Sequence, residues 1–156
     1  YRGENTSNRT YGFIYELPTK TRLKDFFPMQ IFESGALVLA IVILIAFQVK
    51  HFLADFVLQN KYMLKKVART DWFLPLISHS AVHALGTFIV LVYFIGVNAI
   101  YFALVDFAVH TGIDAWKARM TEQNVFRKAF WVALGLDQLA HQLTYIAMAF
   151  IAIVVL

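Results

Sequence analysis

The chain contains no cysteine and has little charge, proline or glycine. Of its 156 residues, 15% are charged, three are proline and seven are glycine. The absence of cysteine excludes a disulfide framework and a thiolate metal site, so any metal would be held by imidazole and carboxylate groups. With 60% hydrophobic residues and a mean hydropathy of +0.61, the chain is too apolar for an ordinary soluble domain. The composition predicts an integral membrane protein.

The chain contains long segments without charged residues. Residues 72–105 contain no Lys, Arg, Asp or Glu. A bilayer core about 30 Å thick is crossed by about 20 mainly apolar residues, so the chain is long enough for about four crossings. The apolar segments predict helices at residues 33–61, 72–95, 99–120 and 129–156, with a tight turn at residues 96–98.

The short connections between these helices predict the fold class. Short connections make neighbouring helices antiparallel. We therefore expect an all-α polytopic membrane protein in which residues 33–156 form an antiparallel bundle of four transmembrane helices. Residues 1–32 are polar and turn-rich, and they are expected to form an extramembrane tail.

Basic residues gather in two of the connections. Residues 61–71 and residues 117–128 each carry four Lys or Arg, whereas residues 96–98 carry none. Positively charged loops remain on the cytoplasmic or matrix side, which predicts a bacterial inner membrane or an organellar inner membrane. Basic loop ends explain the net charge of +4 without a nucleic-acid partner. The expected partners are the lipid bilayer and either another membrane protein or a second copy of the chain.

Each predicted helix carries ionisable residues spaced four apart. Side chains at this spacing project from one face of a helix. All five histidines of the chain belong to the set. Its members are His51, Asp55, His79, His83, Asp106, His110, Asp114, Asp137 and His141.

The depth of these residues agrees between helices. At about 1.5 Å of rise per residue, a first group lies about 9–12 Å from the basic ends and a second group about 15–18 Å. The first group is Asp55, His79, His110 and Asp137, and the second is His51, His83, Asp106 and His141. Asp114 lies nearer the mouth. An antiparallel bundle would bring these residues together in two layers.

Carboxylates inside a bilayer need partners. A charged side chain at the bilayer centre costs about 2.5–3.5 kcal/mol on insertion scales. Imidazole and carboxylate groups around a divalent cation would meet that need, so all nine residues are predicted metal ligands, with zinc favoured over iron or manganese. Nine ligands exceed one tetrahedral site, which favours a dinuclear centre or one metal with a rich outer shell. Interhelical hydrogen bonding alone is the alternative.

Five further polar residues lie close to the set in the sequence. Gln59, Gln138 and Gln142 are expected beside the ligands or in interhelical hydrogen bonds. Lys50 is expected to turn away from the pocket. Lys117 is expected to anchor its helix at the interface, with an electrophilic role at the mouth as the alternative.

The same motifs carry a family resemblance. They are HFLADFVLQNKYM, HSAVH, DFAVHTGIDAWK and DQLAHQLTYI, together with Lys65, within about residues 45–146. The chain resembles a family of small bacterial membrane proteins known as domain of unknown function 3307. The resemblance implies a fold and a polar site, but no activity. More loosely, the chain looks like small membrane-bound metal-dependent hydrolases, whose His/Asp motifs also lie at the membrane face.

Three functions remain open from the sequence. The favoured one is a metal-dependent hydrolase of an amphiphilic substrate, with Asp55 or Asp114 as the catalytic general base. The second is a metal-ion transporter, since HxxxD facing His and acidic residues resembles the intramembrane sites of cation-diffusion facilitators. The third is an accessory structural subunit of a larger membrane complex.

Overall fold

The computed structural model describes residues 34–156, and the expected tail at residues 1–32 lies outside this range. The long helices are α1 (Ser34–Phe52), α2 (Phe73–Ile95), α3 (Ala99–Met120) and α4 (Lys128–Val155). Three short helices connect them, namely η3 (Leu53–Val57), η4 (Met63–Val67) and η5 (Gly96–Asn98). Residues 34–156 contain no strand, which confirms the all-helical class.

Three segments of the described chain are long and apolar enough to cross a membrane. They are Gly35–Val57, Phe73–Arg119 and Lys128–Val155. Large apolar side chains cover the outer surface of each, for example Ile45, Leu85 and Leu143, which are more than half exposed. Such a surface is stable in lipid and unfavourable in water. The chain is therefore an integral membrane protein.

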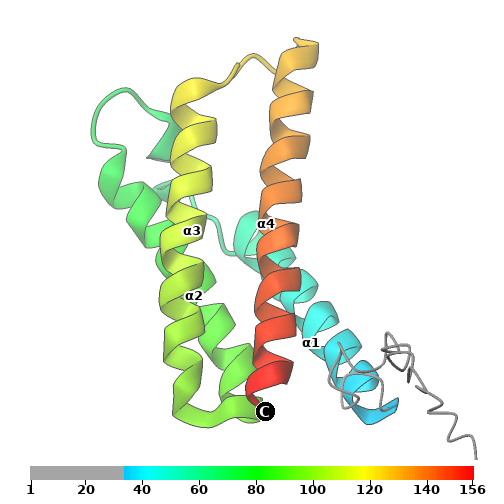
Figure 1. Ribbon diagram of the computed structural model, residues 1–156. Coiled ribbons are helices and arrows are strands. Elements are labelled where there is room, and N and C mark those ends of the chain that lie inside the picture. The colour runs from blue at the N-terminus through cyan, green and yellow to red at the C-terminus, as the bar shows by residue number, and fades with distance from the viewer. Residues whose placement is uncertain (1–33) are drawn as a thin grey trace, which may run out of the picture.

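The middle segment folds back on itself. Helices α2 and α3 lie side by side and meet at one end through η5 (Figure 1). At this turn Gly96 has φ 60° and ψ −146°, a backbone conformation essentially confined to glycine. Because only three residues connect the helices, α2 packs more extensively against α3 than against any other element. The turn predicted at residues 96–98 is thus a short 3-10 helix.

The first helix ends earlier than the sequence suggested. Continuation to residue 61 was wrong, because the α-helix ends at Phe52 and a π-helical turn, η3, follows. Its closing bond runs from the Leu58 amide to the Leu53 carbonyl at 2.8 Å. The Asn60 Oδ1 atom then accepts hydrogen bonds from the backbone amides of Tyr62 and Met63, at 2.9 and 3.0 Å. This turn precedes η4. The spacing of apolar residues predicts neither turn. Turns of π-helix are frequent at functional sites.

The apolar core fills only one half of the molecule. It comprises Ile43, Phe47, Leu91, Ala99, Tyr145, Met148, Ala149 and Ala152. The rings of Phe47 and Tyr145 stack at 5.2 Å at the border of this core. Those of α2, α3 and α4 come from the halves of the helices that lie away from the basic loops, and Ile43 and Phe47 lie near the middle of the first segment. The other half is left for the polar set.

Substitution of Gly96 by alanine should destabilise the fold. A side chain in this backbone conformation costs about 1–3 kcal/mol, so we expect the free energy of unfolding in detergent to fall by about that amount. Gly112→Ala is the matched control, because a Cβ there meets nothing within 4 Å and alanine favours the helix. Equal stability of the two variants would contradict the role of the turn.

Candidate functional site

The predicted polar residues point into the half of the molecule that the apolar core leaves free. Eight of the nine are buried, and only Asp55 is partly exposed, with 15% of its side chain accessible. They come from α1, η3, α2, α3 and α4. A buried cluster of this kind in apolar surroundings needs both charge balance and hydrogen-bond partners.

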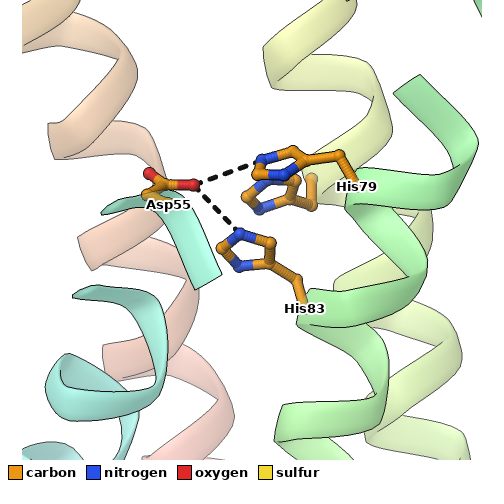
Figure 2. A group of neighbouring side chains, drawn as sticks. Asp55, His79 and His83 are labelled. Carbon is orange, nitrogen blue, oxygen red and sulfur yellow. Dashed lines mark hydrogen bonds and ion pairs between the residues drawn. The ribbon is translucent and has the colours of Figure 1, made fainter. Parts of the chain in front are cut away.

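Asp55 contacts three of the five histidines. Its Oδ1 atom is 3.0 Å from Nε2 of His83 and 3.2 Å from Nε2 of His79, and Figure 2 shows both rings directed at this oxygen. Its Oδ2 atom is 3.2 Å from Nε2 of His51. The π turn η3 carries Asp55 toward α2, so the irregular backbone places this carboxylate among the imidazoles.

Asp114 makes the second set of contacts. Its Oδ2 atom lies 3.4 Å from Nε2 of His79 and 3.6 Å from Nε2 of His110. Its Oδ1 atom lies 3.6 Å from Nε2 of His141. The ring of His79 therefore stands between two carboxylates, one from η3 and one from α3.

Two groups of ligand atoms are compact enough to hold a cation. The first is Asp55, His79, His83 and His110, and the second is His110, Asp114 and His141. The ligand atoms of each group lie within 4.8 Å of one another. Bonds of 2.0–2.1 Å in a tetrahedral zinc site separate neighbouring ligand atoms by about 3.3 Å. The oxygen–nitrogen separations around Asp55 are already close to this value.

Several buried nitrogens have no hydrogen bond. Both ring nitrogens of His79 and of His110, and Nε2 of His141, find no hydrogen-bond partner within residues 34–156. Nε2 of His79 is near two carboxylates, yet neither contact meets hydrogen-bond geometry. Buried polar atoms are almost always paired in folded proteins. Each neutral imidazole has one ring nitrogen with a free lone pair, so each of these three rings can offer one lone pair to a ligand.

Three imidazoles form a stack across the bundle. The ring centroids of His83 and His110 are 3.6 Å apart, and those of His110 and His141 are 4.2 Å apart. Two charged imidazolium rings at such distances would repel each other strongly. The stack suits neutral imidazoles, the form that binds metal ions.

Asp106 lies apart from these imidazoles. Its Oδ2 atom accepts hydrogen bonds from Lys50 Nζ at 2.7 Å and from Thr87 Oγ1 at 2.6 Å. Among the described residues it forms no ion pair with a histidine. The sequence placed it among the ligands because its spacing and depth fit, but a lysine already supplies the positive charge.

Lys50 corrects another expectation. It does not turn away from the pocket, because its side chain is 5% exposed and Nζ also donates to the Tyr145 hydroxyl at 2.9 Å. The lysine stem passes over Gly86, where a Cβ would come within 2.7 Å of Lys50 Cγ. Glycine at this position of α2 leaves the space that the buried ion pair requires.

Two further lysines reach the cluster from the loop side. Lys66 Nζ lies 2.5 Å from Oδ2 of Asp114, and Lys117 Nζ lies 3.0 Å from Oδ2 of Asp137. Lys117 was expected to be an interfacial anchor, but it points inward to this carboxylate. With Lys50 on Asp106, three of the four carboxylates have a lysine.

Asp55 is the exception in this charge pattern. In the described part of the chain its ion pairs are with His51, His79 and His83 alone. With neutral imidazoles the cluster keeps one negative charge at Asp55. A bound cation would balance it at the point where the free imidazole nitrogens also meet.

Side chains outside the predicted set orient the rings. The Tyr145 hydroxyl is 3.1 Å from Nδ1 of His51 and 3.5 Å from Nδ1 of His83. Gln138 Oε1 is 3.1 Å from Nε2 of His51, as expected of a residue beside the ligands. Partners of this kind fix ring orientation and the choice of tautomer. Thr87 and Tyr145 continue the stripes of His83 and His141 four residues further on, a signal that could have identified them.

Removal of the Lys50 charge should destabilise the protein. Lys50→Met leaves Asp106 buried without its cation, and breaking a buried ion pair costs about 3–5 kcal/mol. We expect this loss in the free energy of unfolding measured in detergent. The double variant Lys50→Met with Asp106→Asn removes the charge but keeps an acceptor for Thr87, and it should recover most of the loss. Wild-type stability of Lys50→Met would disprove the pairing.

Comparison with known proteins identifies a family for this chain. The chain matches the family described as "Protein of unknown function (DUF3307)" over residues 43–156, a range that contains all nine residues of the polar set. No curated protein and no solved structure matches the chain. The match covers more than half of the chain, so this protein belongs to the DUF3307 family.

Proposed function

We propose that the protein is a membrane-embedded metal-dependent hydrolase whose divalent cation binds between η3, α2 and α3. The ligands are Asp55, His79, His83 and His110. One observation carries the proposal: the carboxylate without a lysine lies within 4.8 Å of ligand atoms of His79 and His110, two rings whose nitrogens have no hydrogen bond. Zinc fits this nitrogen and oxygen donor set best, with iron or manganese as alternatives.

A metal at this place would supply a nucleophile at neutral pH, because it lowers the pKa of a bound water to about 7. Asp114 shares the contact with His79 from the opposite side, which suits a general base that takes the proton of that water. Asp55 then acts as a ligand rather than as the base. Hydrolysis adds the water oxygen to the electrophilic atom of the substrate and returns a proton to the leaving group.

The second group of ligand atoms supports a dinuclear version of the centre. His110 belongs to both groups, and Asp114 and His141 complete the second. However, Asp114 already has the Lys66 ammonium, so a cation there would have to displace it. This charge competition favours one metal, with His51, Asp137 and His141 in the outer shell.

The arrangement in the membrane follows from helix length. The apolar segment Phe73–Arg119 has 47 residues, about 70 Å as one helix, which is more than twice the bilayer core of about 30 Å. Reversal at Gly96 divides it into two crossings, which gives four in an antiparallel bundle. The basic loops and the open side of Asp55 then lie at the same membrane face.

The distribution of polar residues favours hydrolysis over transport. A transporter needs a polar route to both sides of the membrane. Here the polar set ends at the layer of Lys50 and Asp106, and the core of Ile43, Phe47 and Leu91 packs tightly beyond it. A site open toward one face suits an enzyme that receives an amphiphile and releases its product there.

Metal binding should depend on Asp55. We expect about one divalent cation per purified chain by elemental analysis, as in a mononuclear site. Asp55→Asn should weaken binding by more than about 100-fold, since loss of an outer-shell partner alone costs about 10–100-fold. Asp71→Asn is the matched control, because this carboxylate is exposed in the loop before α2. Equal metal content in both variants would reject the centre, and two cations per wild-type chain would select the dinuclear version.

Loss of the proposed base Asp114 should affect turnover, whereas loss of a metal ligand should affect both metal binding and turnover. Asp114→Asn should retain the metal yet lower turnover by about 10²–10⁴-fold, the contribution of a general base. His79→Ala should lose both metal and turnover while its helical circular dichroism persists. Water-soluble products released from vesicles of anionic phospholipid provide the assay. Full turnover by His79→Ala would rule out the enzyme, whereas metal binding without any turnover would support the accessory-subunit alternative.

A further inference from the structure

An apolar groove runs along the outside of α1, η3 and α2. Its volume is about 450 Å³, and its lining includes Ala46, Leu53, Ala54, Leu58, Gly86 and Ile89. All of these except Leu58 lie inside the segments long and apolar enough to cross a membrane. The groove therefore opens toward hydrocarbon rather than toward water.

Small side chains give the groove its shape. Ala46 and Ala54 of the first segment and Gly86 of α2 line it, and the Lys50 stem packs against Gly86. Lys50 lies along its wall with its charge turned inward to Asp106. From Ala46 to Phe52 the groove follows about 9 Å of α-helix, and it continues past the π turn η3 to Leu58. An apolar groove in this position fits a hydrocarbon chain.

One end of the groove lies toward the basic loop that follows η3. Leu53, Ala54 and Leu58 line it there, whereas Asp55 is directed at His79 and His83 instead. The other end, at Ala46, lies in the regular part of α1.

Positive charge follows at the same end. Leu58 is the last lining residue, and the chain continues into the loop with the exposed lysines Lys61 and Lys65. Three residues span at most about 10 Å, so the Lys61 backbone lies within that distance of Leu58. Lysines at the membrane surface attract anionic lipids by about 1 kcal/mol each.

We propose that this groove binds an acyl chain of an anionic, phosphate-bearing lipid and presents its headgroup to the loop lysines Lys61 and Lys65. As a substrate assignment it rests on the proposed hydrolase, but the binding itself requires no metal. Such a lipid would enter sideways from the bilayer, since the groove is open along its length. The charge at one end and the hydrocarbon slot behind it select this class over a neutral lipid.

Photochemical labelling of the full chain in phosphatidylcholine vesicles tests the proposal. The probe is a trace of phosphatidic acid with a diazirine on its acyl chain, and labelled peptides are mapped by mass spectrometry. We expect label concentrated on groove residues such as Leu53 and Ile89. Ala46→Trp should close the groove and reduce that label several-fold, whereas Ile45→Trp, on the lipid face beside it, should leave the label unchanged. Label spread evenly over exposed apolar residues would overturn the proposal.

The headgroup and the metal are tested separately. Replacement of Lys61 and Lys65 by alanine should reduce labelling by about fivefold per lysine, while a diazirine phosphatidylcholine probe should label the groove weakly in every variant. Equal labelling by the two probes would overturn the anionic assignment. The variant Asp55→Asn should keep its groove label even though its metal is lost. A metal-free protein with a labelled groove would thus refute the hydrolase alone, and a metal-loaded protein without groove label would refute the lipid assignment alone.

Discussion

The neutralisation of four carboxylates inside an apolar bundle governs the whole structure. An unpaired charge in hydrocarbon is costly, so each Asp must have a partner within reach. Lys50, Lys66 and Lys117 satisfy three of them, and these lysines join α1 to α3, η4 to α3, and α3 to α4. The ion pairs hold together helices that gain little from apolar burial in a membrane. Asp55 is left to the imidazoles and to a proposed cation.

Irregular backbone serves the polar half of the molecule. The π turn η3 brings Asp55 to α2, and the Asn60 turn redirects the chain so that η4 brings Lys66 to Asp114. The apolar half, by contrast, consists of regular helices packed through small and aromatic side chains. The packed half thus holds the helices together, while the irregular turns complete the polar cluster.

Much of the site followed from spacing, because side chains four apart share a helix face whatever surrounds them. That rule, with helix direction, was enough to bring His79, His83 and His110 together. It did not anticipate the Lys50 partner of Asp106, since spacing and depth do not reveal whether a lysine or a metal supplies the positive charge. Lys50 was misjudged for the same reason, and the π turn left no trace in the apolar pattern. The transmembrane segments, which depend on composition, were the easiest part to anticipate.

The π turn has a further consequence for sequence change. It contains one residue more than an α-helical turn would need, and each residue of a helix adds about 100° of rotation. Deletion of Leu53 or Ala54 would restore a regular helix and rotate Asp55 away from His79 and His83. The same deletion at Thr70, in the exposed part of the following loop, would merely shorten a connection. The number of residues in this turn therefore matters for the cluster, as the identity of its side chains does.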